Sequence, residues 1–399
     1  MKINALTLVF TTTLLFTACQ DKYPAANMLD EPLSQPLEII IEPKKVAMTS
    51  TWAAGIKDDG TLWTWGSGSG KIRKTTTGKP VDPTPFPVEG INDAVAVSGG
   101  SGHMLLLRKD GTVWGWGYNY YGEVDPISGD RFVKELRKIE GINDVVDIAA
   151  GTSNSFFLTK KGEVYTIGGN DKGWTNGINE PNRVPTKMPN LVDIVRFAGR
   201  GGGLIALNSK GELYSTGISR VALGRTVTNN EYENFNPAQK IDLPRKVVDI
   251  SVTGLGYMAL LDNGDVWVWG HSSLAGLALP KGQSPELPIK HPTLRKIANI
   301  GDRAAVDVDG NLYIWGGIGY GNPNYPFQSI YRTPIKIAEN IDPALLLNGN
   351  EVSAVLDKQG NLHTWGWDTK GQLGIGKELT EKASEQDVLT VHKSLFTTY

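Results

Sequence analysis

The chain has 399 residues, with 40 basic and 42 acidic side chains and a formal net charge of −2. This balance argues against a nucleic-acid partner, because binding to the phosphate backbone requires clustered lysine and arginine, and no basic stripe stands out. Cys19 is the single cysteine, so a disulfide framework and a thiolate metal cluster are excluded. We expect neither a metal nor a cofactor.

The first 18 residues have the pattern of an export signal. A basic start is followed by an apolar run from Ile3 to Phe16, too short to span a bilayer, and then by small residues before Cys19. This pattern resembles the bacterial lipoprotein signal, in which the cysteine is lipidated and becomes the new N-terminus. Gln20 then implies the outer membrane, with the periplasmic or surface side left open. The alternative is an ordinary secretory signal with an incidental cysteine.

Residues 19–35 are polar and contain Pro24 and Pro32, so we expect a flexible tether. The folded part is predicted to span residues 36–392. Its first strand is predicted at Pro36–Ile41, which is similar to Pro334–Ile337 much further along the chain.

The rest of the chain contains seven copies of one eight-residue sequence motif. The best copy is Asp110–Gly117, Asp-Gly-Thr-Val-Trp-Gly-Trp-Gly, in which a tight turn leads into a short strand of alternating large side chains. Its turn glycine recurs about every fifty residues, which indicates a repeat architecture. The turn glycines are Gly60, Gly111, Gly162, Gly211, Gly264, Gly310 and Gly360.

Each repeat is predicted to form four strands. In the second repeat they are Pro85–Val88, Asp93–Val97, His103–Leu107 and Val113–Trp116, with the proline-containing segment at the sheet edge. Four short strands cannot bury their own faces, whereas sheets arranged radially cover one another. The sequence therefore predicts an all-β, seven-bladed propeller.

Two further expectations concern packing between blades. Trp114 and Trp116 are two residues apart, so they face one side of their strand and are predicted to pack blade against blade. A ring also needs its first and last blades joined. Either Pro36–Ile41 or a strand at Asp387–Val391 is expected to complete a shared sheet, and the sequence leaves the choice open.

These motifs resemble the regulator of chromosome condensation repeat. The resemblance rests on Asp110–Gly117 with Tyr118–Gly122 after it, on Trp365–Gly374, and on the turns Gly100–His103 and Ala149–Gly151. It covers about Pro36 to Gly376 and implies a seven-bladed propeller with four-stranded blades.

The resemblance does not by itself imply one function. The founding member is a nucleotide exchange factor for a nuclear GTPase, a role at odds with an export signal. A secreted propeller that inhibits β-lactamases shows that the scaffold binds a protein outside the cytoplasm.

No catalytic signature is present. The histidines are dispersed over different repeats, and there is no nucleophile elbow, phosphate-binding glycine loop or thiol nucleophile. Asp125 and Asp130 are candidates for a hydrolase pair, although acidic turns are the ordinary interpretation. The alternative to a binding protein is a secreted hydrolase or carbohydrate-binding propeller with its site at the central mouth.

The loops differ between repeats and point to a binding face. In an antiparallel blade, the turn before the third strand and the link to the next blade lie on one face, opposite the Asp-Gly hairpins. Tyrosine and tryptophan are enriched in binding hot spots. The candidate partner-binding residues are Trp52, His103 and Asn154 from the turns, and Tyr118, Tyr120, Tyr121, Trp174, Tyr320 and Trp367 from the links. We expect a monomeric, non-enzymatic envelope lipoprotein that binds a protein or glycan through this face.

Lipidation at Cys19 is directly testable. Cells expressing the wild type and the Cys19→Ser variant are labelled with a tagged fatty acid, and only the wild type is expected to carry label. Equal label in both proteins would show that Cys19 is not the lipidated residue.

Overall fold

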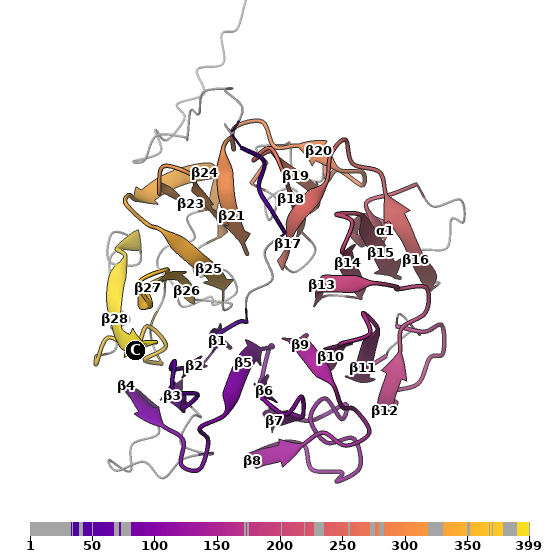
Figure 1. The fold of residues 1–399 in the computed structure, drawn as a ribbon, viewed down its shortest axis with the longest axis vertical. Helices are drawn as coiled ribbons and strands as arrows, with labels where there is room; N and C mark the ends of the chain where they lie inside the picture. The colour runs from indigo at the N-terminus through magenta and orange to yellow at the C-terminus, as the bar shows by residue number, and fades with distance from the viewer. Residues whose placement is uncertain are drawn as a thin grey trace, which may run out of the picture.

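The computed structural model is a ring of seven blades around a central axis (Figure 1). It describes residues 33, 35–39, 43–49, 51–67, 72, 81–170, 173, 175–200, 202–218, 220–226, 235–253, 256–271, 276, 277, 279, 283–317, 330–348, 352–366, 368, 370–377 and 389–398. Cys19 lies outside these residues. The predicted all-β, seven-bladed propeller is confirmed.

Each blade is a four-stranded antiparallel sheet whose strands follow one another from the axis to the rim. The strands are, in blade 1, β1 (Val46–Met48), β2 (Trp52–Ile56), β3 (Leu62–Ser67) and β4 (Val81–Pro87); in blade 2, β5 (Ala94–Gly99), β6 (His103–Arg108), β7 (Val113–Tyr118) and β8 (Phe132–Lys138); in blade 3, β9 (Val145–Ala150), β10 (Asn154–Thr159), β11 (Val164–Gly168) and β12 (Asn182–Lys187); in blade 4, β13 (Ile194–Arg200), β14 (Gly203–Asn208), β15 (Leu213–Gly217) and β16 (Asn236–Ile241); in blade 5, β17 (Val247–Thr253), β18 (Gly256–Leu261), β19 (Val266–Gly270) and β20 (Ile289–Lys290); in blade 6, β21 (Ile297–Gly301), β22 (Ala304–Asp307), β23 (Leu312–Gly317) and β24 (Ile330–Ala338); and in blade 7, β25 (Pro343–Asn348), β26 (Val352–Asp357), β27 (Asn361–Gly366) and β28 (His392–Thr397). Within the described part of the chain, a short helix, α1 (Arg220–Leu223), follows β15.

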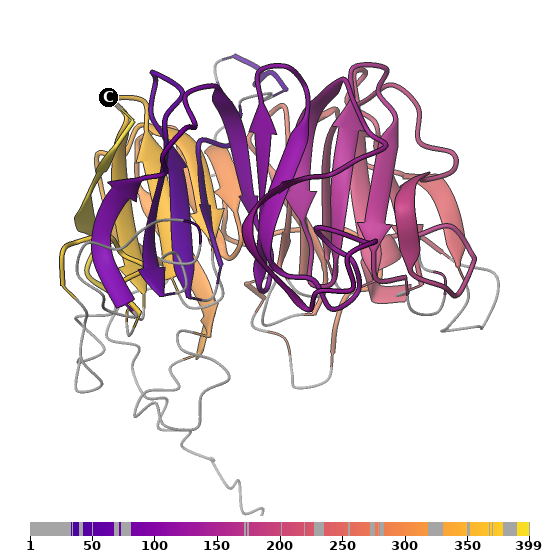
Figure 2. The same ribbon diagram turned by 90° about the horizontal axis from the view of Figure 1, so that it is seen from below.

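The blades present two different faces. The seven turn glycines join the second and third strands of each blade, and all seven have φ between +71° and +81°, which a residue with a side chain rarely adopts. These hairpins form one face, the hairpin face. The inner turns and the long links before each outer strand lie on the opposite face, the link face, as predicted: the N–H of Tyr118 donates to Gly102 O at 2.8 Å. In Figure 2 the C-terminus marks the hairpin-face side, at the top.

The prediction that a proline-containing strand opens each repeat is wrong. Each such strand is the last strand of the blade before it. Pro85 lies in β4, which pairs with β3 in blade 1 instead of opening blade 2. The link loop is long enough to bring each outer strand back beside the strand that precedes it, so every blade is built from one continuous segment.

Blade interfaces contain the hydrophobic core. Seven buried apolar clusters lie among the described residues, and each one joins two consecutive blades. In β6, Met104 and Leu106 pack toward blade 1, while Leu105 and Leu107 pack toward blade 3. Trp116 is buried between blades 1 and 2, as predicted, whereas Trp114 is half-buried at the margin of the same cluster.

The ring closes without a sheet shared between its first and last blades. The outer strand of blade 7 is β28, which lies just beyond the predicted Asp387–Val391 and carries the folded part past the predicted end at 392. Phe396 of β28 stacks on Trp65 of blade 1, with ring centroids 5.2 Å apart. A Cβ at Gly55 would lie 2.5 Å from Phe396 Cζ, so glycine is required for this approach. The Trp65 indole N–H also donates to Gln372 O at 2.7 Å.

The N-terminal segment does not form the predicted strand at Pro36–Ile41. Residues 36–39 form no strand, and 40 and 41 lie outside the described residues. The Leu37 N–H donates instead to Asp262 O, at 2.7 Å, on the hairpin face of blade 5. Within the described residues, no helix has the length and apolar character needed to cross a membrane.

The junction between blades 7 and 1 has no covalent connection, and Phe396 is central to it. Phe396→Ala is expected to lower the free energy of unfolding by about 3–5 kcal/mol, because it removes a buried ring and leaves a cavity. Denaturant unfolding of the folded ring measures this change. Leu395→Ala, on an exposed neighbour in β28, should change stability by less than about 0.5 kcal/mol. Similar small effects from both substitutions would contradict this account of ring closure.

Candidate partner-binding surface

The link between β7 and β8 places three tyrosines on the surface of blade 2. Tyr118 is 47% exposed, Tyr120 60% and Tyr121 43%. The Tyr118 ring lies 5.7 Å from that of Tyr120 and 5.6 Å, edge-on, from that of Phe132 at the start of β8. The Arg131 guanidinium lies 5.8 Å from the Tyr120 ring. The exposed aromatic residues therefore form one cluster that also includes Phe132 and Arg131, two residues that the sequence did not single out.

A buried asparagine fixes the link. The Asn119 amide donates to Asp125 O and Asp130 O, both at 2.8 Å. Its side-chain oxygen accepts from the backbone N–H groups of Val124, at 3.0 Å, and Asp125, at 2.9 Å. Asn170 makes similar bonds in the link of blade 3, where it accepts from Thr175 N at 2.9 Å and donates to Ile178 O at 2.6 Å. Four bonds from one side chain hold the turn of the link in a single conformation.

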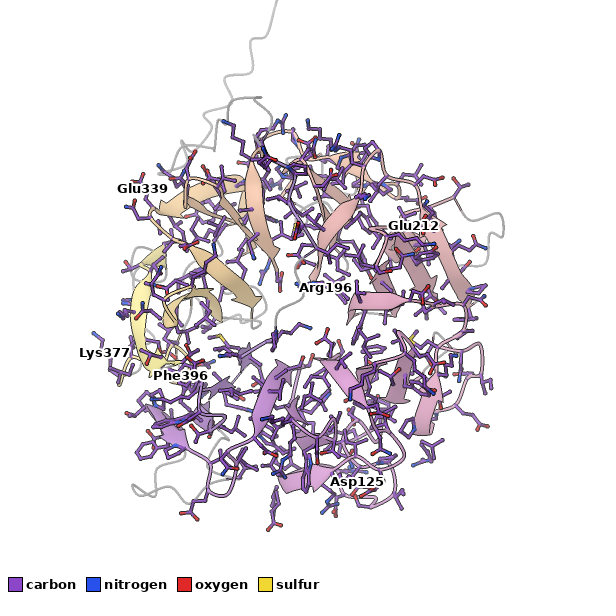
Figure 3. The ribbon with its side chains drawn as sticks, in the orientation of Figure 1. Asp125, Arg196, Glu212, Glu339, Lys377 and Phe396 are labelled. Carbon is purple, nitrogen blue, oxygen red and sulfur yellow. The ribbon has the colours of Figure 1, made fainter. Side chains whose placement is uncertain are left out.

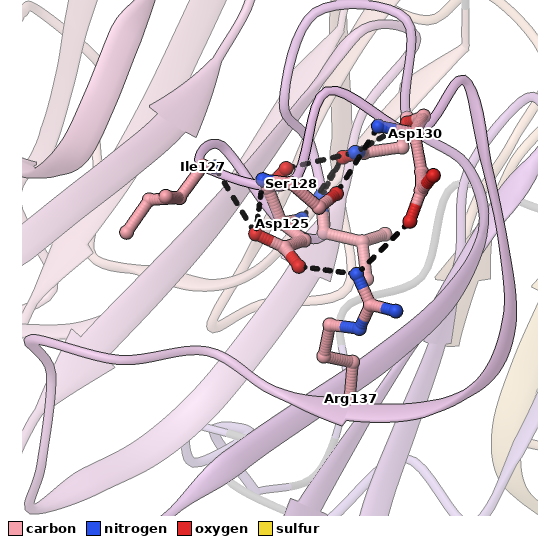
Figure 4. A network of polar contacts seen from close by, with 7 residues as sticks. Asp125, Ile127, Ser128, Asp130 and Arg137 are labelled. Atoms are coloured by element: carbon pink, nitrogen blue, oxygen red, sulfur yellow. Dashed lines mark hydrogen bonds and ion pairs between the residues drawn. The ribbon is translucent and has the colours of Figure 1, made fainter.

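Asp125 and Asp130, considered above as a hydrolase pair, share one arginine instead (Figure 4). Arg137 Nη1 lies 2.5 Å from Asp125 Oδ2 and 3.4 Å from Asp130 Oδ2. Burial alone would raise the pKa of Asp125, but hydrogen bonds from Arg137 and from the N–H groups of Ile127 and Ser128 outweigh it and lower the pKa. A carboxylate held ionised by these donors suits an ion pair and does not suit a general acid.

A buried hydrogen-bond chain connects the link to blade 3. Ser155 Oγ donates to Glu123 O at 2.6 Å, so its oxygen accepts the proton of His103 Nε2, 3.0 Å away. Burial lowers the pKa of His103 to about 4, which keeps the imidazole neutral near pH 7. His103 thus joins two blades.

The three candidates from the inner turns do not reach the surface. Trp52, His103 and Asn154 are 6%, 0% and 3% exposed, respectively. Each is the first residue of its second strand, and its side chain is enclosed by neighbouring structure instead of projecting from the turn. These three residues are therefore not part of the exposed surface. Trp174, Tyr320 and Trp367 lie outside the described residues.

Blade 3 contacts the link of blade 2 that carries the tyrosines. Arg183 Nη1, on β12, donates to Pro126 O in the blade 2 link at 3.3 Å. Ile127 and Ile178, from the two links, are 81% and 61% exposed. We name Tyr118, Tyr120, Tyr121, Ile127 and Ile178 the link-face patch.

The ring also contains a central cavity of about 200 Å³, lined by the inner strands of the blades. Its charged groups are paired: Lys44 Nζ lies 3.4 Å from Asp147 Oδ1, and Arg196, labelled near the ring centre in Figure 3, lies 2.8 Å from Asp249 Oδ1. No histidine lines the cavity among the described residues, and no group of His, Cys, Asp or Glu there is arranged to hold a metal ion. These ion pairs could not be predicted from the sequence, because their partners lie in different blades or outside the repeats.

Comparison with known proteins agrees with the fold. A family model described as the regulator of chromosome condensation (RCC1) repeat matches residues 94–123 and 145–173. These residues contain the first three strands of blades 2 and 3 with the beginning of each link. The mouse "RCC1-like G exchanging factor-like protein" is 26% identical over 343 residues, which cover 77% of this chain and 74% of the relative.

Solved structures give the same fold. Prp20p from Saccharomyces cerevisiae is 21% identical, covers 90% of this chain over 87% of its own, and superposes with a TM-score of 0.64. Yeast RCC1 (Prp20) in complex with Kap60 gives a TM-score of 0.65 at 20% identity, over 95% of this chain and 91% of the other. Residues 94–123 and 145–173 therefore match the RCC1 repeat, and the whole ring has the fold of these seven-bladed propellers.

The four hydrogen bonds of the Asn119 side chain, named here the Asn119 clamp, predict how the link responds to a substitution. Asn119→Ala removes two donors and leaves the N–H groups of Val124 and Asp125 without their acceptor, at a cost of about 1–3 kcal/mol for each buried unpaired group. Amide hydrogen exchange at Val124 and Asp125 should become faster. Asn119→Asp keeps the acceptor oxygen and is expected to preserve most of that protection. Unchanged exchange in Asn119→Ala would show that the backbone alone fixes the link.

Proposed function

We propose that this RCC1-repeat propeller is a non-enzymatic scaffold that binds a partner protein through the link-face patch. The observation that carries the proposal is an exposed cluster of three tyrosines on a link fixed by a buried asparagine. Relatives with this fold are described with protein partners: Prp20p with binding properties to Gsp1p and histones, and yeast RCC1 with Kap60 bound.

The patch has the physical properties of a binding hot spot. Tyrosine offers a large contact area with few rotatable bonds, so ordering it on binding costs little conformational entropy. The clamp and the ion pairs of Arg137 order the link before the partner arrives. Preorganisation of this kind increases affinity because less freedom is lost on association.

We further propose that the protein is a lipid-anchored envelope protein of the outer membrane. The proposal rests on the resemblance of residues 1–19 to a lipoprotein signal. Leu37 is hydrogen-bonded on the hairpin face, at Asp262. A tether that leaves from this side would direct the opposite, tyrosine-bearing face away from the membrane.

The alternative enzyme or carbohydrate-binding site at the central mouth finds less support. The cavity charges are cation–carboxylate pairs, and no free pair of carboxylates faces the cavity among the described residues. Turnover of a substrate by the purified domain would overturn the non-enzymatic proposal.

Capture from the native envelope with the lipid-free domain tests the binding surface. Tyr120→Ala is expected to weaken capture of a protein partner by about 2 kcal/mol or more, roughly thirtyfold, as removal of a central aromatic does. Trp174→Ala and Trp367→Ala test the neighbouring links in the same assay.

Val308→Ala is the matched control, because Val308 is 47% exposed beside a hairpin turn on the other face. It should bind as the wild type does. If all three aromatic variants fold normally and retain full binding, the partner uses another face.

A further inference from the structure

The link that carries the tyrosines contains a buried carboxylate. Glu123 is only 3% exposed, and its Oε2 accepts from the backbone N–H of Tyr121 at 2.9 Å. The backbone oxygen of Glu123 accepts from Ser155 Oγ of blade 3, at 2.6 Å. Glu123 therefore holds the turn of the link with its side chain and ties that turn to the next blade with its backbone.

Blade 7 has a glutamine at the same place in its link. Glu123 lies seven residues after Trp116, and Gln372 lies seven residues after Trp365. The side-chain Oε1 of Gln372 accepts from the backbone N–H of Lys370, two residues before it, at 3.0 Å. An uncharged amide thus makes in blade 7 the bond that a carboxylate makes in blade 2. The bond itself does not require a charge, so the charge in blade 2 needs a separate account.

No cation is paired with the Glu123 carboxylate in the part of the chain that the structure describes. Three arginines adjoin the link, and each is engaged elsewhere: Arg137 in ion pairs, Arg131 over a tyrosine ring and Arg183 at a backbone oxygen. The segments of blade 3 next to Glu123, residues 153–155 and 166–170, contain no charged side chain. Without a compensating cation, burial disfavours the ionised carboxylate.

The ionisation of Glu123 is therefore linked to the order of the link. Burial raises the pKa of Glu123 above its ordinary value of 4.5, although the N–H groups of Glu123, Tyr121 and Gly122 act in the opposite direction. The ordered link then binds this proton more tightly than an open link in which water reaches the carboxyl group. The penalty for ordering the link is absent at low pH, sets in above about pH 4.5 and grows until the pH exceeds the raised pKa.

Two other titratable groups adjoin this turn, and neither changes charge over most of that range. His103 reaches the Glu123 backbone through Ser155, and burial lowers the pKa of His103 to about 4, so the imidazole is neutral above that pH. The pKa of Asp125 is lowered, so its carboxylate stays ionised. Glu123 is the group of the three that titrates as the pH rises from acid to neutral.

We propose that Glu123 positions the tyrosines of blade 2 and makes their order depend on pH, with the link most ordered when Glu123 carries a proton. The proposal rests on the binding function proposed above and adds its regulation. An ordered link presents Tyr120 and Tyr121 before the partner arrives, which increases affinity. Binding should therefore strengthen as the pH falls from neutral toward about 4.5.

Amide hydrogen exchange of the full chain measures the order of the link. Exchange at Tyr121, corrected for the rate in an unstructured peptide, is compared between the wild type and Glu123→Gln from about pH 4 to about pH 8. The two proteins should agree near pH 4. Near pH 8 the wild type should exchange at least about threefold faster, because only its link contains a buried charge.

Two further variants separate the charge from the hydrogen bond. Glu123→Ala removes the acceptor of the Tyr121 N–H and should exchange about fivefold or more faster than Glu123→Gln at every pH. Glu135→Gln, which removes an exposed carboxylate of β8, is the matched control for the loss of a charge and should follow the wild type throughout.

The capture assay then connects the order of the link to binding. The ratio of capture by Glu123→Gln to capture by the wild type should rise about threefold between pH 5 and pH 8, and taking the ratio removes any titration of the partner itself. A constant ratio would contradict regulation of binding by Glu123.

Equal exchange in the wild type and Glu123→Gln over the whole range overturns the proposal. Slower exchange in the wild type near pH 8 also overturns it, because the charge would then strengthen the link. The binding function fails separately: if Tyr120→Ala is captured as well as the wild type, the partner uses another face even where exchange at Tyr121 responds to pH as expected.

Discussion

The structure depends on the fact that a four-stranded blade cannot cover either of its faces. Alternate residues of one strand must therefore belong to different cores, and β6 does this with Met104 and Leu106 on one side and Leu105 and Leu107 on the other. Both faces need an apolar neighbour, so the middle of the second strand in each blade is largely apolar on both sides, and stability comes from contacts between blades. A ring is the arrangement in which no blade is left with an uncovered face.

This constraint explains which parts of the fold the sequence predicts. The turn glycines recur because each hairpin requires a positive φ at the same place, and a rule of local geometry is visible in one chain. Outer-strand membership is not local. Pro85–Val88 lies between two loops, and its neighbour is chosen by the path of the link before it. Ring closure could not be predicted from the sequence either. Phe396 lies near the C-terminal end of the chain, whereas its neighbours Trp65 and Gly55 lie near the beginning.

The same distinction applies to the candidate site. Tyr118, Tyr120 and Tyr121 follow the end of a strand and reach solvent as expected, since a link has room to turn its side chains outward. Trp52, His103 and Asn154 follow a turn in the sequence but begin the next strand, where the adjacent blade covers them. The clamp was detectable: Asn119, Asn170 and Asp368 each come two residues after the glycine that ends the third strand. That recurrence has a physical purpose, since Asn119 and Asn170 satisfy link backbone groups that the strands cannot reach.

The two faces of the ring differ in their capacity for variation. A hairpin face made of tight turns is fully determined by its glycines and by side chains such as Asp110, which accepts from Thr112 N at 2.9 Å. The links differ in length and composition between blades, because only their first turn must meet the next blade. Blade 2 departs from its two neighbours twice, with exposed tyrosines in the link and with Leu136 where the outer strands of blades 1 and 3 carry Pro85 and Pro185. The exposed tyrosines add little to the packing of the ring, whereas Leu136 packs against the buried cluster between blades 1 and 2. Packing within the ring therefore accounts for Leu136 and leaves the exposed tyrosines as the feature on which the proposed binding function rests.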